Sequence, residues 1–148
     1  MSFADTEVGD SRRTAGRTIT EADLVNFAGV SGDFNHLHTD AERMRESGYG
    51  ERIAHGALVF SIATGLLWQE RAAGGDEGSD VVAFYGVDRL RFRGPTFVSD
   101  TVHVETEVVE LEERPDHPEA AGVVREEAEV VDQDGTVVLS CELLALVA

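Results

Sequence analysis

The chain has 148 residues, 42% of them hydrophobic, which suits one domain with a buried core. It carries 29 acidic and 12 basic residues, so its formal net charge is −17. A surface this negative repels nucleic-acid phosphates and anionic lipid, and no concentrated basic face is visible in the sequence. We therefore expect no nucleic-acid partner and no membrane partner.

All basic residues are arginines, because the sequence contains no lysine. Together with the excess of acid this is typical of halophilic cytosolic proteins, and the alternative is GC-rich codon usage combined with an acidic surface. The one cysteine, Cys141, excludes an internal disulfide and fits a reducing compartment. The first residues contain no apolar signal stretch, so the expected location is the cytoplasm.

The first elements along the chain are short. Residues 1–10 are acidic and are expected to be a flexible start. Ser11–Ile19 could form a short strand. Thr20 followed by Asp23 resembles a capping box and predicts a helix through about Gly29.

A polar turn follows this helix and contains Asp33, Asn35, His36 and His38. Asp40 then suits the cap of a second short helix, 41–47, which nearby glycines end. The turn therefore lies between two helices.

A long apolar run begins at Gly56. No charged residue occurs between Gly56 and Gln69, and the apolar positions surround a helical wheel, so we expect a helix buried on all sides. At 1.5 Å per residue the helix is about 20 Å long, too short to span a bilayer.

The second half of the chain is rich in β-branched and aromatic residues in alternation. Strands are predicted at 82–92, 102–108, 123–131 and 136–147, where Asp134-Gly135 marks a tight turn before the last one. The order of elements predicts an α+β fold, in which an antiparallel sheet covers one long central helix.

Two features of the sequence suggest chemistry. Asp33 and His38 could hold and activate one water, since a carboxylate accepts protons and an imidazole can donate or accept them near neutral pH. The alternative is that these residues only form and cap a turn. His55 and Gly56 stand where the apolar helix begins, and the Gly56 N–H could stabilise an anion there. The alternative is a plain glycine turn into the helix.

Residues 31–58 read SGDFNHLHTDAERMRESGYGERIAHGAL, which resembles the hydratase signature of the MaoC-like (R)-specific enoyl-CoA hydratase family. That signature is Gly-Asp-x-Asn-Pro-x-His, followed by an acidic residue and a spacer ending in His-Gly. The later segment LRFRGPTFVSDTVHVETEV is similar to a strand motif of the same family. This chain has His36 in place of the family's proline, and His36 could loosen the turn or add a titratable group.

The resemblance implies that residues 1–148 form a single hot-dog domain, usually paired as a homodimer or higher homo-oligomer. It implies reversible syn addition of water to trans-2-enoyl-CoA. The enzyme would be a hydratase in the direction of addition and a 3-hydroxyacyl-CoA dehydratase in the reverse direction. Asp33 and His38 would activate the water, and the Gly56 N–H would hold the thioester oxygen. Asn35 would support the loop, and Thr64 matches a position where the family often has a small hydroxyl residue. No cofactor is implied, because coenzyme A is part of the substrate.

Several arginines are candidates for binding the phosphates of coenzyme A. Arg89, Arg91 and Arg93 alternate along a predicted strand and would share one face. The alternative is a solvated face balanced by acids. Arg52, just before the long helix, is a further candidate. A metal site formed by Asp33, His36, His38 and His55 is conceivable, but we expect none, because their presence is explained without a metal.

Two other functions remain open. A hot-dog acyl-CoA thioesterase would need a carboxylate near the thioester, and residues 56–69 of the predicted helix contain none. A non-catalytic acyl-CoA-binding module could keep the fold, but the presence of Asp33, Asn35, His38 and Gly56 together argues against it.

Overall fold

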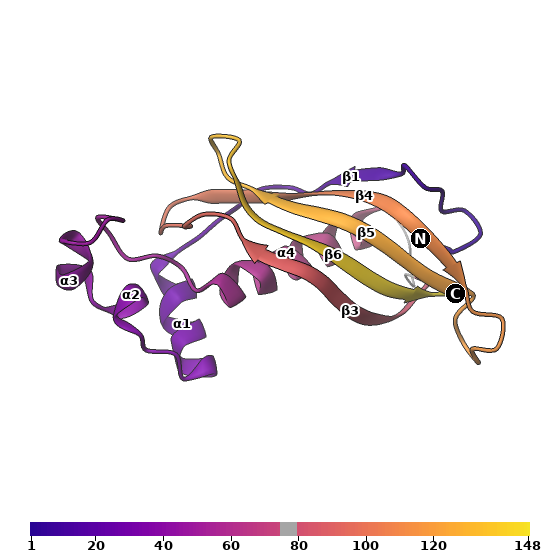
Figure 1. Cartoon of the computed structure of the whole chain (residues 1–148), viewed down its shortest axis with the longest axis horizontal. Helices are drawn as coiled ribbons and strands as arrows, with labels where there is room; N and C mark the ends of the chain where they lie inside the picture. Colours follow the sequence, from indigo (N-terminus) through magenta and orange to yellow (C-terminus); the bar gives the residue numbers. More distant parts are fainter. Residues whose placement is uncertain (75–79) are drawn as a thin grey trace.

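The computed structural model describes residues 1–74 and 80–148 (Figure 1). Four helices and six strands lie within these ranges. The helices are α1 (Glu21–Ser31), α2 (His36–Thr39), α3 (Ala41–Arg45) and α4 (Gly56–Ala73). The strands are β1 (Ser11–Arg13), β2 (Arg17–Thr18), β3 (Val81–Phe92), β4 (Thr101–Glu113), β5 (Gly122–Val131) and β6 (Val137–Val147).

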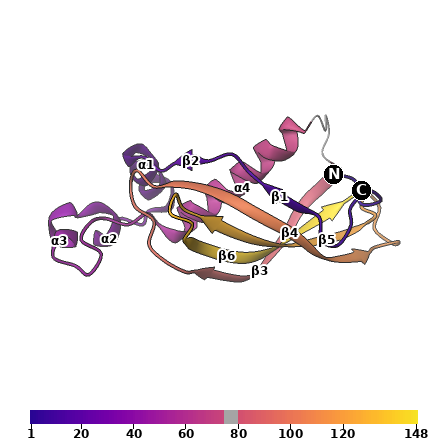
Figure 2. The ribbon, with the colours of Figure 1, turned by 90° about the horizontal axis from the view of Figure 1, so that it is seen from above.

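The strands form an antiparallel sheet in the order β1-β4-β5-β6-β3. The short strand β2 also pairs with β4, but with a different part of it than β1 does. The long helix α4 packs on one face of this sheet, whereas α1, α2 and α3 lie at one end of it (Figures 1 and 2). The chain termini lie at the opposite end. The predicted α+β architecture with a sheet covering a central helix is confirmed.

One face of α4 forms the centre of the core. Leu58, Ile62 and Leu66 are buried against sheet residues that include Val104 and Leu139. The expectation that α4 is buried on all sides is wrong for the chain as described, because the opposite face is open. That face contains Ser61 and Trp68, and Trp68 is 56% exposed. Alanine and glycine make an exposed helix face look apolar in the sequence. A helical wheel alone therefore does not distinguish a helix buried on all sides from one with an exposed face.

Several of the first ten residues contact the sheet, where we expected a flexible start. Met1 is buried, and Phe3 packs with it on a second apolar cluster around Val124 and Val147. The Phe3 N–H donates to the Ala148 carbonyl at 2.9 Å. A Cβ on Gly122 would lie 2.2 Å from the Phe3 ring, so the glycine makes room for the phenylalanine.

The helix signals in the first half are confirmed. Thr20 and Asp23 form the reciprocal capping box at the start of α1, and Asp40 accepts from the Arg43 N–H at the start of α3. The single strand expected over 11–19 is instead divided into β1 and β2. Among the described residues no helix has the length and apolarity needed to cross a membrane.

Candidate active site

The turn between α1 and α2 is built from local side-chain hydrogen bonds. Gly32 ends α1 in the left-handed conformation, at φ 77°. The Asp33 Oδ1 then accepts from the Asn35 N–H at 3.1 Å, and the Asn35 Oδ1 accepts from the Leu37 N–H at 3.0 Å. Asn35 is thus the N-cap of α2, and its side chain holds the turn in place. No pattern in the sequence predicted α2, which is only four residues long.

His36 is the first residue of α2. The first helical position tolerates proline well, because its N–H needs no partner within the helix. The position at which the signature has proline is therefore also suitable for His36. His36 is not part of the cluster formed by Asp33, His38 and His55.

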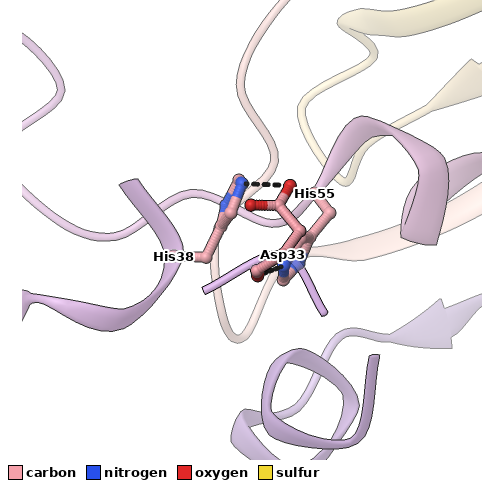
Figure 3. Close-up of side chains that lie close together, drawn as sticks. All are labelled: Asp33, His38 and His55. Carbon is pink, nitrogen blue, oxygen red and sulfur yellow. Dashed lines mark hydrogen bonds and ion pairs between the residues drawn. The ribbon is translucent and has the colours of Figure 1, made fainter. Parts of the chain in front are cut away.

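His38 is buried and its two ring nitrogens have different surroundings. Nδ1 lies 2.7 Å from the Ile53 carbonyl oxygen, which can only accept, so Nδ1 carries the hydrogen. Nε2 lies 3.7 Å from the Asp33 Oδ2 (Figure 3). The side chain of Asp33 is 52% exposed, so the pair connects a buried imidazole with a carboxylate open to solvent.

His55 completes this cluster from the other side. It is 3% exposed, and its Nε2 donates to the Asp33 backbone carbonyl at 2.9 Å. Its ring stacks on the ring of His38, with centroids 3.7 Å apart and planes inclined by 24° (Figure 3). The ring of Phe27, on α1, meets it edge-on at 5.0 Å.

Gly56 is the first residue of α4, where backbone N–H groups have no partner within the helix. A Cβ at this position would lie 2.6 Å from the ring of Phe92, so only glycine fits here without a shift. An open cavity of about 450 Å³ lies beside Gly56. Its wall also includes His38, Tyr49, Phe92 and Arg93. A small ligand in this cavity can therefore contact both the imidazole and the start of α4.

Phe92 and Tyr49 were not predicted as wall residues. Phe92 comes from the end of β3 and Tyr49 from the loop before α4, and both are about half exposed. No motif marks either residue, because their position depends on how distant segments meet.

Thr64 lies outside this cavity. It lines a separate apolar groove of about 540 Å³ between α4 and β3, and its hydroxyl donates to the Ser61 carbonyl at 2.7 Å. Eight residues along a helix correspond to about 12 Å of rise and about 80° of rotation, which separates Thr64 from Gly56.

The arginines differ in their surroundings. Arg52 binds both carboxylate oxygens of Glu21 and therefore joins the segment before α4 to α1. The hydrogen bond from Arg52 lowers the pKa of Glu21. Arg52 is thus committed to a carboxylate, which favours loop support over phosphate binding.

The simple alternation expected for Arg89, Arg91 and Arg93 is interrupted, although Arg89 and Arg93 still line one hollow on the sheet together with Ser140. The register of β3 against β6 shifts between Asp88 and Arg91, and Arg89 has a positive φ of 52°. Arg89 pairs with Glu142, and Arg91 donates to the carbonyl of Leu90. Of the three, only Arg93 lines the cavity beside Gly56.

Asp33, His38 and His55 each offer a possible metal-ligand atom, and these atoms lie within 4.8 Å of one another. A metal ion binds an imidazole nitrogen in the plane of its ring, along the lone pair. The two rings are stacked with centroids 3.7 Å apart and planes inclined by 24°, so the planes meet only far from the rings, and one ion cannot lie in both of them at bonding distance. The donor set is therefore a poor fit for a metal ion, whereas it suits hydrogen bonding to a water or substrate.

The arrangement of sheet and helix defines a hot-dog fold. A solved protein from Mycobacterium tuberculosis, described as having a double hotdog fold, superposes with a TM-score of 0.84 at 23% identity. That match covers 99% of this chain and 44% of the other. At this identity the likeness concerns the fold alone.

The chain belongs to the MaoC-like domain family, whose model matches residues 3–130. It is 35% identical over 113 residues to the (R)-specific enoyl-CoA hydratase of Aeromonas caviae, and this match covers 76% of this chain and 78% of the relative. It is 43% identical over 103 residues to Protein MaoC of Klebsiella aerogenes, covering 69% of this chain but only 29% of that protein. An X-ray structure of a monoamine oxidase regulatory protein from Archaeoglobus fulgius has a TM-score of 0.89 at 36% identity, covering 99% of this chain and 94% of the other.

Proposed function

We propose that this protein is an (R)-specific enoyl-CoA hydratase, which also acts in reverse as a 3-hydroxyacyl-CoA dehydratase. The observation that carries the proposal is the approach of the Asp33 Oδ2 to the His38 Nε2, 3.7 Å apart, with His38 and Gly56 on the wall of one cavity. The similarity to a curated (R)-specific enoyl-CoA hydratase supports it.

A water between Asp33 and His38 would donate hydrogen bonds to both side chains. Because the His38 Nδ1–H is held by the Ile53 carbonyl, Nε2 has its lone pair free to accept a proton from that water. The oxygen of the water would add to C3 of the enoyl group, and its proton would pass to the pair. The pair would return a proton to C2 on the same face, so water is added without any other reactant.

The N–H groups at the start of α4 would stabilise the thioester oxygen as negative charge develops on it. They lie at the positive end of an 18-residue helix, beside the cavity. The Gly56 N–H is the proposed donor.

The coenzyme A part of the substrate would extend past the outer wall of the cavity. Arg93 lies there and donates from Nε to the Ser140 hydroxyl, which leaves its other nitrogens for a phosphate. We propose no cofactor and no metal for this reaction.

We further propose that two copies pair along β3, which is an end strand of the sheet. Phe84 and Tyr85 on β3 and Trp68 on α4 are each more than half exposed, so the outer edge of β3 adjoins exposed aromatic side chains. Light scattering should give the mass of a dimer or a multiple of it, and a monomer at micromolar concentration would contradict this part of the proposal.

The test is the loss of ultraviolet absorbance of crotonyl-CoA, with wild-type protein beside Asp33→Asn. Asparagine keeps the shape but removes the base, so we expect turnover to fall by about two orders of magnitude or more with an unchanged melting temperature. The product should be the (R)-3-hydroxyacyl thioester. Wild-type turnover in Asp33→Asn would contradict the role of Asp33.

The same assay separates the alternatives. A thioesterase would release free thiol, and a binding module would change neither absorbance nor thiol. In residues 56–69 of α4 no carboxylate occurs, and the nearby Glu70 pairs with Arg12. Those observations do not favour a thioesterase.

A further inference from the structure

His55 contacts three parts of the candidate active site. Its Nε2 donates to the backbone of Asp33, its ring face lies on His38, and its own backbone leads directly into Gly56. The edge of Phe27 holds the ring from α1.

The tautomer of His55 follows from its hydrogen bond. A carbonyl oxygen can only accept, so Nε2 carries a hydrogen. The Nδ1 is buried and has no hydrogen-bond partner among the described residues. The hydrogen bond to Asp33 therefore places a hydrogen on Nε2, whereas no contact among the described residues calls for one on Nδ1.

Helix capping does not explain His55. It occupies the N-cap of α4, a position where Ser, Thr, Asp or Asn usually bonds the first turn, but its side chain makes no such bond. The side chain instead reaches back to Asp33. Its contacts are thus directed at the pair and not at the stability of α4.

His38 and Asp33 both depend on this contact for their position. The ring of His38 is fixed at Nδ1 by the Ile53 carbonyl and supported on one face by His55. The Asp33 carboxylate is half exposed and makes a local bond to the Asn35 N–H. Its backbone, however, is held by His55.

We propose that His55 is a positioning residue for the hydration reaction. Its ring, through the hydrogen bond to Asp33 and the stack on His38, fixes the Asp33 carboxylate and the His38 Nε2 relative to each other and to the Gly56 N–H. This inference rests on the proposed function, because it assigns His55 a role in that reaction.

Three substitutions separate the two contacts. His55→Gln keeps an amide N–H at a similar reach and loses the stacked ring. His55→Phe keeps a ring on His38 and loses the hydrogen bond, and His55→Ala loses both. The matched control is His103→Gln, since His103 bonds Glu105 on β4, away from the cavity.

We expect His55→Ala to lower kcat by about 100-fold with little change in KM, because misplacing reacting groups by about 1 Å costs that much. His55→Gln and His55→Phe should each recover part of the loss, and His103→Gln should retain wild-type turnover. Activities are compared per folded protein, measured by circular dichroism. In wild-type protein, ¹⁵N–¹H correlation spectra should show His55 with its hydrogen on Nε2 at pH 7.

The outcomes separate this inference from the proposed function. Wild-type protein without turnover would overturn the hydratase proposal and the role of His55 in it. Active wild-type protein together with an unchanged kcat in His55→Ala would overturn only the role of His55. If His55→Ala does not fold, His55→Gln and His55→Phe decide by the same criterion. A hydrogen on Nδ1 instead of Nε2 would also overturn the inference.

Discussion

Single residues at the cavity act through close contact, as Gly56 and Phe92 illustrate. The ring of Phe92 occupies the space into which a side chain at position 56 would point. Glycine therefore has two possible reasons to be present: room for Phe92 and room for a substrate at the start of α4. Substitutions can distinguish these reasons.

We expect Gly56→Ala to lower both stability, by about 1–3 kcal/mol through overpacking, and turnover, by at least about tenfold. In the double variant with Phe92→Ala the stability should return, because the methyl group then has space. Turnover should not return, since the methyl group still lies beside the proposed oxyanion site. Melting temperatures and crotonyl-CoA kinetics of both variants and of Phe92→Ala alone test this. Full recovery of turnover in the double variant would show that Phe92 alone requires the glycine.

At the scale of residues, the sequence predicts which side chains lie close together only where they belong to one local motif. Asp33, Asn35 and His38 are close in the chain, so the turn brings them together by itself. The position of Arg93 at the cavity depends on where β3 ends, and no local pattern contains that information. The stack of His38 on His55 depends in the same way on the path of the chain between α2 and α4.

At the scale of elements, α4 is tied to the sheet by an ion pair within the apolar contact. Arg71, near the end of α4, donates to Glu126 on β5 at 2.6 Å, and Glu126 is 2% exposed. Thr106 on β4 adds a long contact to the same carboxylate at 3.4 Å. The pair lies along the groove that contains Thr64.

Breaking this pair should be costly. Arg71→Met leaves a buried carboxylate without its cation, and we expect the free energy of unfolding to fall by about 3–5 kcal/mol. Arg71→Met combined with Glu126→Leu should restore most of it. The exposed pair Arg45–Glu42 on α3 is the control, and Arg45→Met should cost less than about 1 kcal/mol. Urea unfolding measures all three, and equal losses in the single variants would contradict the expectation.

The ion pair between Glu21 and Arg52 predicts a pH dependence. The hydrogen bond from Arg52 holds the pKa of Glu21 below its ordinary value. A carboxylate with a lowered pKa in the folded state stabilises the fold above its unfolded pKa, and this contribution is lost as the pH falls through the folded value. It should not exceed about 1 kcal/mol, because Glu21 is more than half exposed.

The difference in unfolding free energy between wild type and Glu21→Gln should therefore be present at pH 7 and shrink in acid. Urea unfolding at pH 7 and at pH 4 and below measures it. A difference that is constant over this range would contradict the lowered pKa.

The elements themselves were largely predictable, and the exception has a physical cause. The alternation of apolar residues and the turn at Asp134-Gly135 predicted the last strands, and the capping residues predicted α1 and α3. The exposure of one face of α4 was not predictable, because alanine, glycine and serine suit a buried or an open surface equally well. The shift in β3 near Arg89 has no marker in the sequence either.

Across the whole molecule, acidic residues gather on the face of the sheet that points away from α4. Glu105 lies opposite Glu129, Glu107 opposite Glu127, and Glu127 also opposite Glu142. Like charges directly opposite each other destabilise a sheet, and Arg13 and Arg125 compensate only some of them. Repulsion between these glutamates is one way in which the net charge of −17 lowers the stability of the fold.

We expect the melting temperature to rise from dilute buffer to molar KCl, because salt screens repulsion between exposed charges. Glu127→Gln should raise the melting temperature in dilute buffer and reduce its dependence on salt. Thermal melts of both proteins over the same KCl series test this. A melting temperature for the wild type that is independent of salt would contradict it.

The neighbouring ends of the chain have a practical consequence. The Phe3 N–H donates to the Ala148 carbonyl, and the two chain ends lie at the end of the molecule opposite α1 and α2 (Figures 1 and 2). A short glycine linker could join the two ends, and the loop 114–121, on the surface at the same end, could be opened instead. Such a circular permutant would keep every strand pair and leave the cavity untouched. The protein is thus suited to insertion into another protein, or to attachment to a solid support, with its cavity facing outwards.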